Sequence, residues 1–166
     1  MNSRLHSGFR EILQAVRDAG ERVYGERLVS LAIFGSVARG SMRADSDIDL
    51  LIVADHLPDG RMARVREFGQ VESLVADVLQ RAKGAGINTI LSPVFKTREE
   101  LQRGSLLFLD MTDQAEILYD RGAALRRYLD DFAFRLQKMG AERVRSGGGY
   151  YWRLKPDLKP GEKILL

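Results

Sequence analysis

Residues 34–53 read FGSVARGSMRADSDIDLLIV, and this segment determines how the rest of the 166-residue chain is interpreted. It starts at the end of an apolar, β-branched run, LVSLAIF at 28–34, which predicts a buried strand. Gly35 and Ser36 interrupt that run, and a short helical turn is expected over 37–39. A second strand is predicted over 47–53, DIDLLIV, because this segment is apolar after its two acids. The Gly-Ser break therefore lies between two predicted strands.

The two acids at the start of the second strand predict a metal site. Asp47 and Asp49 are two residues apart, so in a strand they project from the same face while Ile48 points into the core. Neighbouring carboxylates repel each other and cost stability unless a cation lies between them. Mg²⁺ prefers hard oxygen ligands and commonly uses one or two carboxylates together with substrate phosphates. We therefore expect Asp47 and Asp49 to bind Mg²⁺ or Mn²⁺.

The Gly-Ser turn predicts a phosphate site beside that metal. Gly35 lets the backbone approach a ligand closely, and the helical turn from Ser36 directs free N–H groups and the positive end of its dipole at an anion. The Ser36 hydroxyl and the Arg39 guanidinium can bind phosphate oxygens, and Ser46 is a further candidate contact. Phosphates beside a metal suit in-line phosphoryl transfer. A nucleoside triphosphate is the expected ligand.

Each of these residues also has an ordinary structural interpretation. Gly35-Ser36 alone would be a common strand-to-helix turn, and only its spacing from the acids makes it functional. Arg39 is equally explained as a surface residue paired with a carboxylate. Ser46 is typical of a residue that shapes the entry to a strand, with phosphate contact as the less common alternative.

The segment resembles the signature of the polymerase-β-type nucleotidyltransferases, and especially of their minimal prokaryotic members. That signature is Gly-Ser, about ten residues, then acid-hydrophobic-acid, and here it stands as Gly35-Ser36, ten residues, and Asp47-Ile48-Asp49. The resemblance implies an α/β (α+β) fold with a mixed twisted sheet and flanking helices. It also implies transfer of a nucleoside monophosphate, AMP in particular, from ATP or another NTP to an acceptor. Gly35 and Ser36 would then hold the β and γ phosphates, while Asp47 and Asp49 would be the catalytic metal ligands.

This chain departs from the family pattern in one respect. Active members usually bring a third acid from a later strand, but residues 85–96, AGINTILSPVFK, contain no Asp or Glu. Asn88 or Ser92 would take the expected place, and neither side chain acts as a base at neutral pH. Two hypotheses follow: an active enzyme whose acceptor is a protein, an RNA or a small molecule, or a catalytically weak nucleotide-binding module. The second would be, for example, an antitoxin-like partner of a HEPN-type protein, as some minimal members are.

The remaining elements are expected to alternate around these two strands. Apolar periodicity predicts helices over 5–19, 62–82 and 125–139, and β-rich runs predict strands over 87–95 and 115–119. The sequence TREE at 97–100 matches a capping box. The stripe at 125–139 is typical of core or of a homodimer seam. Together with the resemblance, these elements imply a nucleotidyltransferase domain over 1–143.

A Gly- and Pro-rich tail is predicted over 144–166. Its aromatic residues, Tyr150, Tyr151 and Trp152, would either anchor the tail to the domain or stack on a nucleic-acid base.

Composition narrows the function classes. Without cysteine the chain has no disulfide, no cysteine-ligated zinc and no thiol nucleophile. Its 26 basic and 23 acidic residues leave a net charge of +3, which suits phosphate ligands but is below the basic surface expected for tight duplex binding. No segment reaches the ~20 apolar residues that span a bilayer. A soluble cytoplasmic protein without membrane partners is expected.

Overall fold

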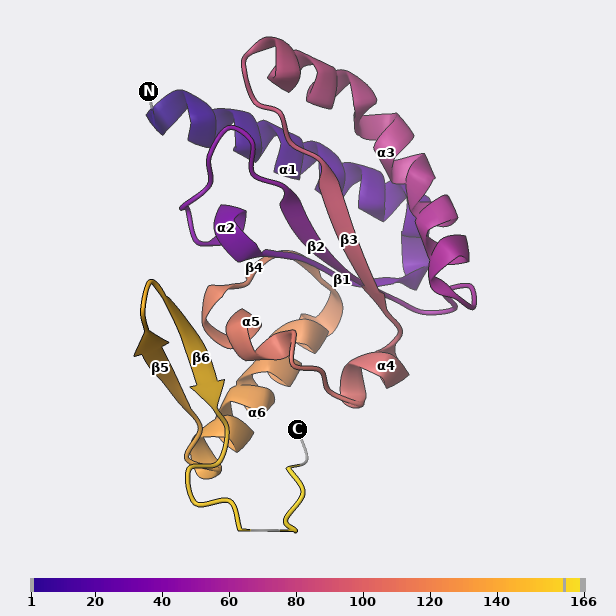
Figure 1. Cartoon of the computed structure of the whole chain (residues 1–166). Coiled ribbons are helices and arrows are strands. Elements are labelled where there is room, and N and C mark those ends of the chain that lie inside the picture. The colour runs from indigo at the N-terminus through magenta and orange to yellow at the C-terminus, as the bar shows by residue number, and fades with distance from the viewer. Residues whose placement is uncertain (1, 160, 165–166) are drawn as a thin grey trace.

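A four-stranded mixed sheet forms the centre of the molecule (Figure 1). The computed structural model describes residues 2–159 and 161–164. The strands lie in the order β3 (Leu91–Lys96), β2 (Ile48–Ala54), β1 (Leu28–Phe34) and β4 (Glu116–Asp120). β2 and β3 are parallel, whereas β1 is antiparallel to both of its neighbours. The structure thus confirms the predicted mixed sheet with flanking helices.

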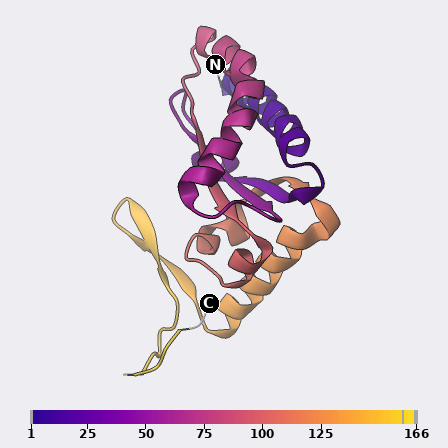
Figure 2. The ribbon, with the colours of Figure 1, turned by 90° about the vertical axis from the view of Figure 1, so that its right-hand side faces the viewer.

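Helices cover both faces of this sheet. On one face lie α1 (Asn2–Tyr24) and α3 (Arg61–Gly84), and on the other lie α5 (Phe108–Gln114) and α6 (Ala124–Lys138). The shorter helices are α2 (Gly35–Ala38), α4 (Arg98–Gln102) and the 3₁₀ turns η1 (Gly25–Arg27) and η2 (Arg121–Ala123). A two-stranded hairpin of β5 (Glu142–Ser146) and β6 (Gly149–Arg153) follows α6 and stands off the body (Figure 2).

The alternation of side chains along β2 divides the core into two clusters. Ile48, Leu50 and Ile52 pack with the residues of α1 and α3, whereas Leu51 and Val53 pack with those of α5 and α6. Successive strand residues point to opposite faces, so Asp49 shares the face of Leu51. The second candidate acid therefore projects toward the side of the sheet that α5 and α6 cover.

The last helix is a core element held by a carboxylate cap. Its predicted apolar stripe is buried in the second cluster through Leu125, Leu129 and Phe132, so the core interpretation of the stripe holds. Asp120 at the end of β4 accepts hydrogen bonds from the backbone N–H groups of Leu125, at 2.9 Å, and Arg126, at 3.0 Å. These bonds satisfy N–H groups that a helix leaves free at its start.

Several segments differ from the sequence-based prediction, among them the first helix, which spans Asn2–Tyr24 instead of 5–19, and α5, which the sequence pattern does not predict. The strand expected over 87–95 begins only at Leu91, because the Asn88 N–H bonds to the Ala44 carbonyl, at 2.7 Å, instead of joining the sheet. The β5–β6 hairpin begins at Glu142, so the predicted boundary between a domain over 1–143 and a tail over 144–166 falls inside β5.

The capping box is confirmed. The Thr97 hydroxyl accepts from the Glu100 N–H at 3.2 Å, and the Glu100 carboxylate accepts from the Thr97 N–H at 2.9 Å.

Among the helices of the described ranges, none combines the length and the apolar composition needed to span a membrane.

Candidate active site

The register of the sheet brings the signature residues to one place. Phe34, the last residue of β1, pairs with Asp49 in β2, and Asp49 pairs in turn with Ser92 in β3. The Gly-Ser turn follows Phe34 directly as the start of α2. The end of β1 and the beginnings of β2 and β3 therefore form a single site at one end of the sheet.

Gly35 lies against the Asp49 carboxylate. A Cβ atom built on Gly35 would overlap Oδ2 of Asp49 and lie 3.3 Å from its Cγ. The φ angle of Gly35 is +70°, in the left-handed region that favours glycine. Both backbone conformation and space therefore favour glycine here, because a side chain would displace the carboxylate of a candidate metal ligand.

Gly35→Ala is expected to reduce metal-dependent nucleotide binding at least about 10-fold, since the new methyl group must displace the Asp49 carboxylate from a ligand position. The backbone strain should also cost about 1–2 kcal/mol of stability. Gly122→Ala is the matched control, because Gly122 has a similar φ of +62° but nothing within 4 Å of its would-be Cβ. Calorimetric titration and thermal melting of both variants separate the effects. Equal nucleotide binding in the two variants would contradict the prediction.

The two aspartates interact electrostatically. Burial is the main cause that raises the pKa of Asp49 above its ordinary value, and the Asp47 carboxylate raises it further. Arg39 and a hydrogen bond with Ser92 act in the opposite direction and lower this pKa. Asp47 is exposed and immediately precedes β2. Asp49 is thus a half-buried acid with a like charge beside it, which a cation would stabilise.

Arg39 and Ser46 flank these acids in different ways. Arg39 is exposed, and its guanidinium donates to Oε1 of Gln114 at the end of α5 at 3.4 Å. The Ser46 hydroxyl accepts the Arg43 N–H at 2.9 Å, and the Ser46 N–H donates to the Arg43 carbonyl at 3.1 Å. These bonds are those of a turn residue before a strand. Phosphate contact by Ser46 stays a prediction.

Ser92 pairs with Asp49 in β3, the later strand from which the resemblance implies a third acid. Over residues 2–159 and 161–164, no group of three or more His, Cys, Asp or Glu side chains is arranged to hold a metal ion. The available oxygen ligands are the carboxylates of Asp47 and Asp49 and the neighbouring Ser92 hydroxyl. This set fits Mg²⁺, which keeps several waters and is often bound by only one or two carboxylates plus phosphates.

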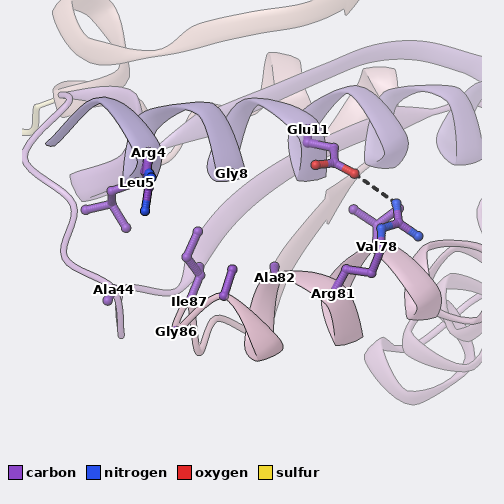
Figure 3. A pocket seen from close by; sticks show the side chains of 11 residues that line it. Arg4, Leu5, Gly8, Glu11, Ala44, Val78, Arg81, Ala82, Gly86 and Ile87 are labelled. Atoms are coloured by element: carbon purple, nitrogen blue, oxygen red, sulfur yellow. Dashed lines mark hydrogen bonds and ion pairs between the residues drawn. The ribbon is translucent and has the colours of Figure 1, made fainter. Parts of the chain in front are cut away.

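A cavity of about 900 Å³ lies elsewhere, between α1, the end of α3 and the loop before β3 (Figure 3). Apolar side chains line it, among them Leu5, Val78 and Ile87. Glu11 in α1 and Arg81 in α3 also line it and form an ion pair at 2.8 Å. It belongs to the α1 and α3 face of the sheet, opposite to Asp49, and is lined by neither the Gly35-Ser36 turn nor the Asp47 and Asp49 pair. The cavity is therefore not the candidate active site.

A mixed sheet that ends in a Gly-Ser turn beside paired aspartates defines a protein of the phosphoryl-transfer class. The family model described as nucleotidyltransferase domain matches residues 10–106, and the chain belongs to this family. The chain is also 32% identical over 109 residues to the "Putative protein adenylyltransferase" of Methanocaldococcus jannaschii, covering 64% of this chain and 69% of that protein. The expected family and the enzyme class are thereby confirmed.

Solved structures show weaker similarity. A chain from the complex of the tri-AMPylated HEPN toxin of Shewanella oneidensis with its MNT antitoxin is 16% identical, with a TM-score of 0.41, over 83% of this chain and 88% of that one. Another Shewanella oneidensis structure is 15% identical, with a TM-score of 0.44, over 76% of this chain and 88% of that one. The fold of this protein is therefore assigned from its own sheet and its family.

Proposed function

We propose that this protein transfers AMP from ATP to a hydroxyl group of another protein, with a divalent metal ion as cofactor. The observation that supports this most directly is the contact of Asp49 with the Gly35 turn. It brings a candidate metal ligand next to the turn whose backbone is suited to phosphate oxygens. The protein adenylyltransferase name of the relative supports the choice of AMP and of a protein acceptor. ATP and Mg²⁺ abound in the cytoplasm, where we propose that the enzyme acts.

We assign the residues of the site the following roles within this proposal. Gly35 leaves room for the β and γ phosphates, and Ser36 donates to their oxygens. Arg39, next to Asp49, balances phosphate charge with its guanidinium. Asp47 and Asp49 would hold the metal ion, which when bound neutralises charge on the phosphates and the leaving group. In the transfer, the bond between the α-phosphorus and the oxygen bridging to the β-phosphate breaks, and a bond forms from the α-phosphorus to the acceptor oxygen. Pyrophosphate is released, and the acceptor proton passes to solvent.

A second candidate function has one observation in its favour. Ser92, rather than an acid, stands opposite Asp49, and a serine hydroxyl is a weaker metal ligand than a carboxylate and no base at neutral pH. The protein would then bind the nucleotide with little turnover. It would act through a protein partner, in the manner that the toxin-antitoxin complexes among the similar structures suggest.

Incubation of the protein with ATP labelled at the α-phosphate, Mg²⁺ and a lysate of the source cells tests the two candidates. Transfer of label to a protein band, with release of pyrophosphate and loss of both on chelation, is the expected result. Binding of ATP without transfer would overturn the enzyme proposal in favour of the second candidate. Label on RNA alone would overturn the proposed acceptor class.

A further inference from the structure

The β5–β6 hairpin has two faces of different chemistry. Directly opposed residues of an antiparallel pair lie on the same face, and Tyr150 pairs with Arg145 while Trp152 pairs with Arg143. These four side chains therefore share one face. Consistent with this, the Arg143 guanidinium lies over the Tyr150 ring, 4.6 Å from its centroid. The hairpin thus has a face with two arginines, two aromatic rings and no acid.

On the opposite face of the hairpin, the two charged residues pair with each other. This face carries Glu142, Val144, Tyr151 and Arg153. Arg153 forms an ion pair with Glu142 at 2.7 Å. By contrast, Arg145 on the first face has no ion-pair partner among the residues that the structure describes. Uncompensated positive charge is therefore concentrated on the face of Arg143 and Arg145.

That basic face turns toward the body of the protein. The Trp152 indole N–H donates to Oδ1 of Asp110 in α5 at 2.8 Å, and the ring packs against the second core cluster. In Figure 1 the β5–β6 hairpin and α2 lie on the same side of the view. Arg145 and Tyr150, on the same face, lie nearer the hairpin tip than Trp152 does.

Helix α5 connects this face to the candidate active site. Asp110 holds Trp152, and Gln114 holds the Arg39 guanidinium. Residues four apart lie on the same side of a helix, about 6 Å apart along its axis. Trp152 and Arg39 are thus bonded to residues on one face of the same short helix, one turn apart.

The site at the end of the sheet recognises only part of a nucleotide. Its Gly-Ser turn, Arg39 and aspartates suit phosphates and a metal ion, and they include no aromatic ring that could stack on a base. We propose that the inward face of the hairpin is the nucleobase site: Tyr150 stacks on the base, and Arg145 contacts a phosphate of the same nucleoside triphosphate. This inference rests on the proposed function and identifies the residues that recognise the nucleoside.

A single nucleotide suits this face better than a nucleic-acid strand or an acidic peptide. Tyr150 is 41% exposed, whereas Trp152 is engaged with Asp110, so the face offers one accessible ring. One ring and two guanidiniums match one base and its phosphates. A strand would require several stacking rings along a basic groove, and the chain has a net charge of only +3.

Calorimetric titration with ATP and with inorganic tripolyphosphate, both with Mn²⁺, tests the proposal. In the wild-type protein ATP should bind more tightly than tripolyphosphate. Tyr150→Ala should weaken ATP binding about 10-fold, the loss of one stacked base, and leave tripolyphosphate binding unchanged. Tyr150→Phe should retain the ATP affinity. Tyr151→Ala is the matched control, because Tyr151 is 48% exposed on the opposite face of the same strand.

The outcomes separate this inference from the proposed function. If Tyr150→Ala binds ATP as the wild type does, or if Tyr151→Ala weakens binding equally, the nucleobase site is not on this face. If Tyr150→Ala leaves ATP binding intact but loses binding of an oligoribonucleotide or of the acceptor protein, the face belongs to the acceptor and the inference is overturned. Failure of the wild-type protein to bind either ATP or tripolyphosphate with Mn²⁺ would instead refute the proposed function.

Discussion

Asp49→Asn should abolish metal-dependent AMP transfer, with activity falling by about 100-fold or more, while the metal-free protein becomes more stable. Replacing a residue that only hydrogen-bonds to a metal ligand costs about 10–100-fold, and the loss here should be larger because Asp49 would be a direct ligand. The amide keeps the size of the carboxylate, so packing against Gly35 is preserved. Binding of Mn²⁺ and ATP followed by calorimetry, together with the rate of pyrophosphate release, measures the functional part.

The stability effect follows from the raised pKa of Asp49. An acid whose pKa is higher in the folded state than in the unfolded state binds protons more tightly when folded, so ionisation destabilises the fold. Stability is therefore lost as the pH rises from the unfolded-state pKa through the raised folded-state pKa, and the loss persists at neutral pH. Asn has no charge to bury beside Asp47. With a chelator present, the melting temperature of Asp49→Asn at pH 7 should thus exceed that of the wild type, and the difference should shrink toward pH 3.

Asp45→Asn provides the control for this substitution. Asp45 is an exposed aspartate of the same loop, and its carboxylate accepts from the Arg43 guanidinium at 3.2 Å. Exposed pairs of this kind contribute little to stability, so Asp45→Asn should change neither melting nor metal binding appreciably. Retention of metal-dependent transfer by Asp49→Asn, or its loss in Asp45→Asn, would show that the metal ligands have been misassigned.

The sequence predicted best those features that depend on neighbouring residues. The predicted strand at 28–34 has the observed bounds, because every residue of LVSLAIF except Ser30 is apolar and polar segments flank the run. The capping box at Thr97 and Glu100 was equally predictable from the sequence, because both of its hydrogen bonds join residues three apart. The Gly-Ser turn and the acids were found through their spacing, which reflects two adjacent strands and the loop that joins them.

Features that depend on distant contacts were missed. The hairpin is held by a hydrogen bond between Trp152 and Asp110, which are 42 residues apart in the sequence. Asp110 lies in α5, and this helix is too short for its apolar periodicity to be recognised. A local signal for the hairpin was present, because Gly147 and Gly148 separate the two paired strands and two-residue glycine turns favour hairpins. The two aromatic residues on the inward face of the hairpin also differ in a way that only the fold reveals: Trp152 is bonded to Asp110, whereas Tyr150 is exposed.

The register of the sheet was likewise beyond local reasoning, and it determines which residue faces the acids. The sequence left Asn88 and Ser92 as alternatives for the third position. In the structure Asn88 lies in a loop and bonds to Ala44 through its backbone, whereas Ser92 pairs with Asp49. Parallel pairing between β2 and β3 thus places Ser92, and not Asn88, beside Asp49.

Ser92→Asp is accordingly expected to strengthen the metal site. A third carboxylate next to Asp49 adds a charged oxygen ligand where the wild type has a hydroxyl, so Mn²⁺ affinity should rise about 10-fold or more. In the metal-free protein the same change places a further negative charge beside two others. The melting temperature should therefore fall in chelator and recover when Mn²⁺ is added. If the proposed enzyme is limited by its missing acid, transfer should also become faster.

Two further variants make this prediction specific. Ser92→Asn has nearly the size of Asp without its charge, so it should bind Mn²⁺ no better than the wild type. Asn88→Asp adds the same charge in the preceding loop, away from the residue that pairs with Asp49, and should leave affinity unchanged. Calorimetric titration of the three variants with Mn²⁺ alone suffices, because it needs no acceptor. An affinity increase in Asn88→Asp but not in Ser92→Asp would mean that the third ligand position lies in the loop before β3 and that the site opens toward the α1 and α3 face.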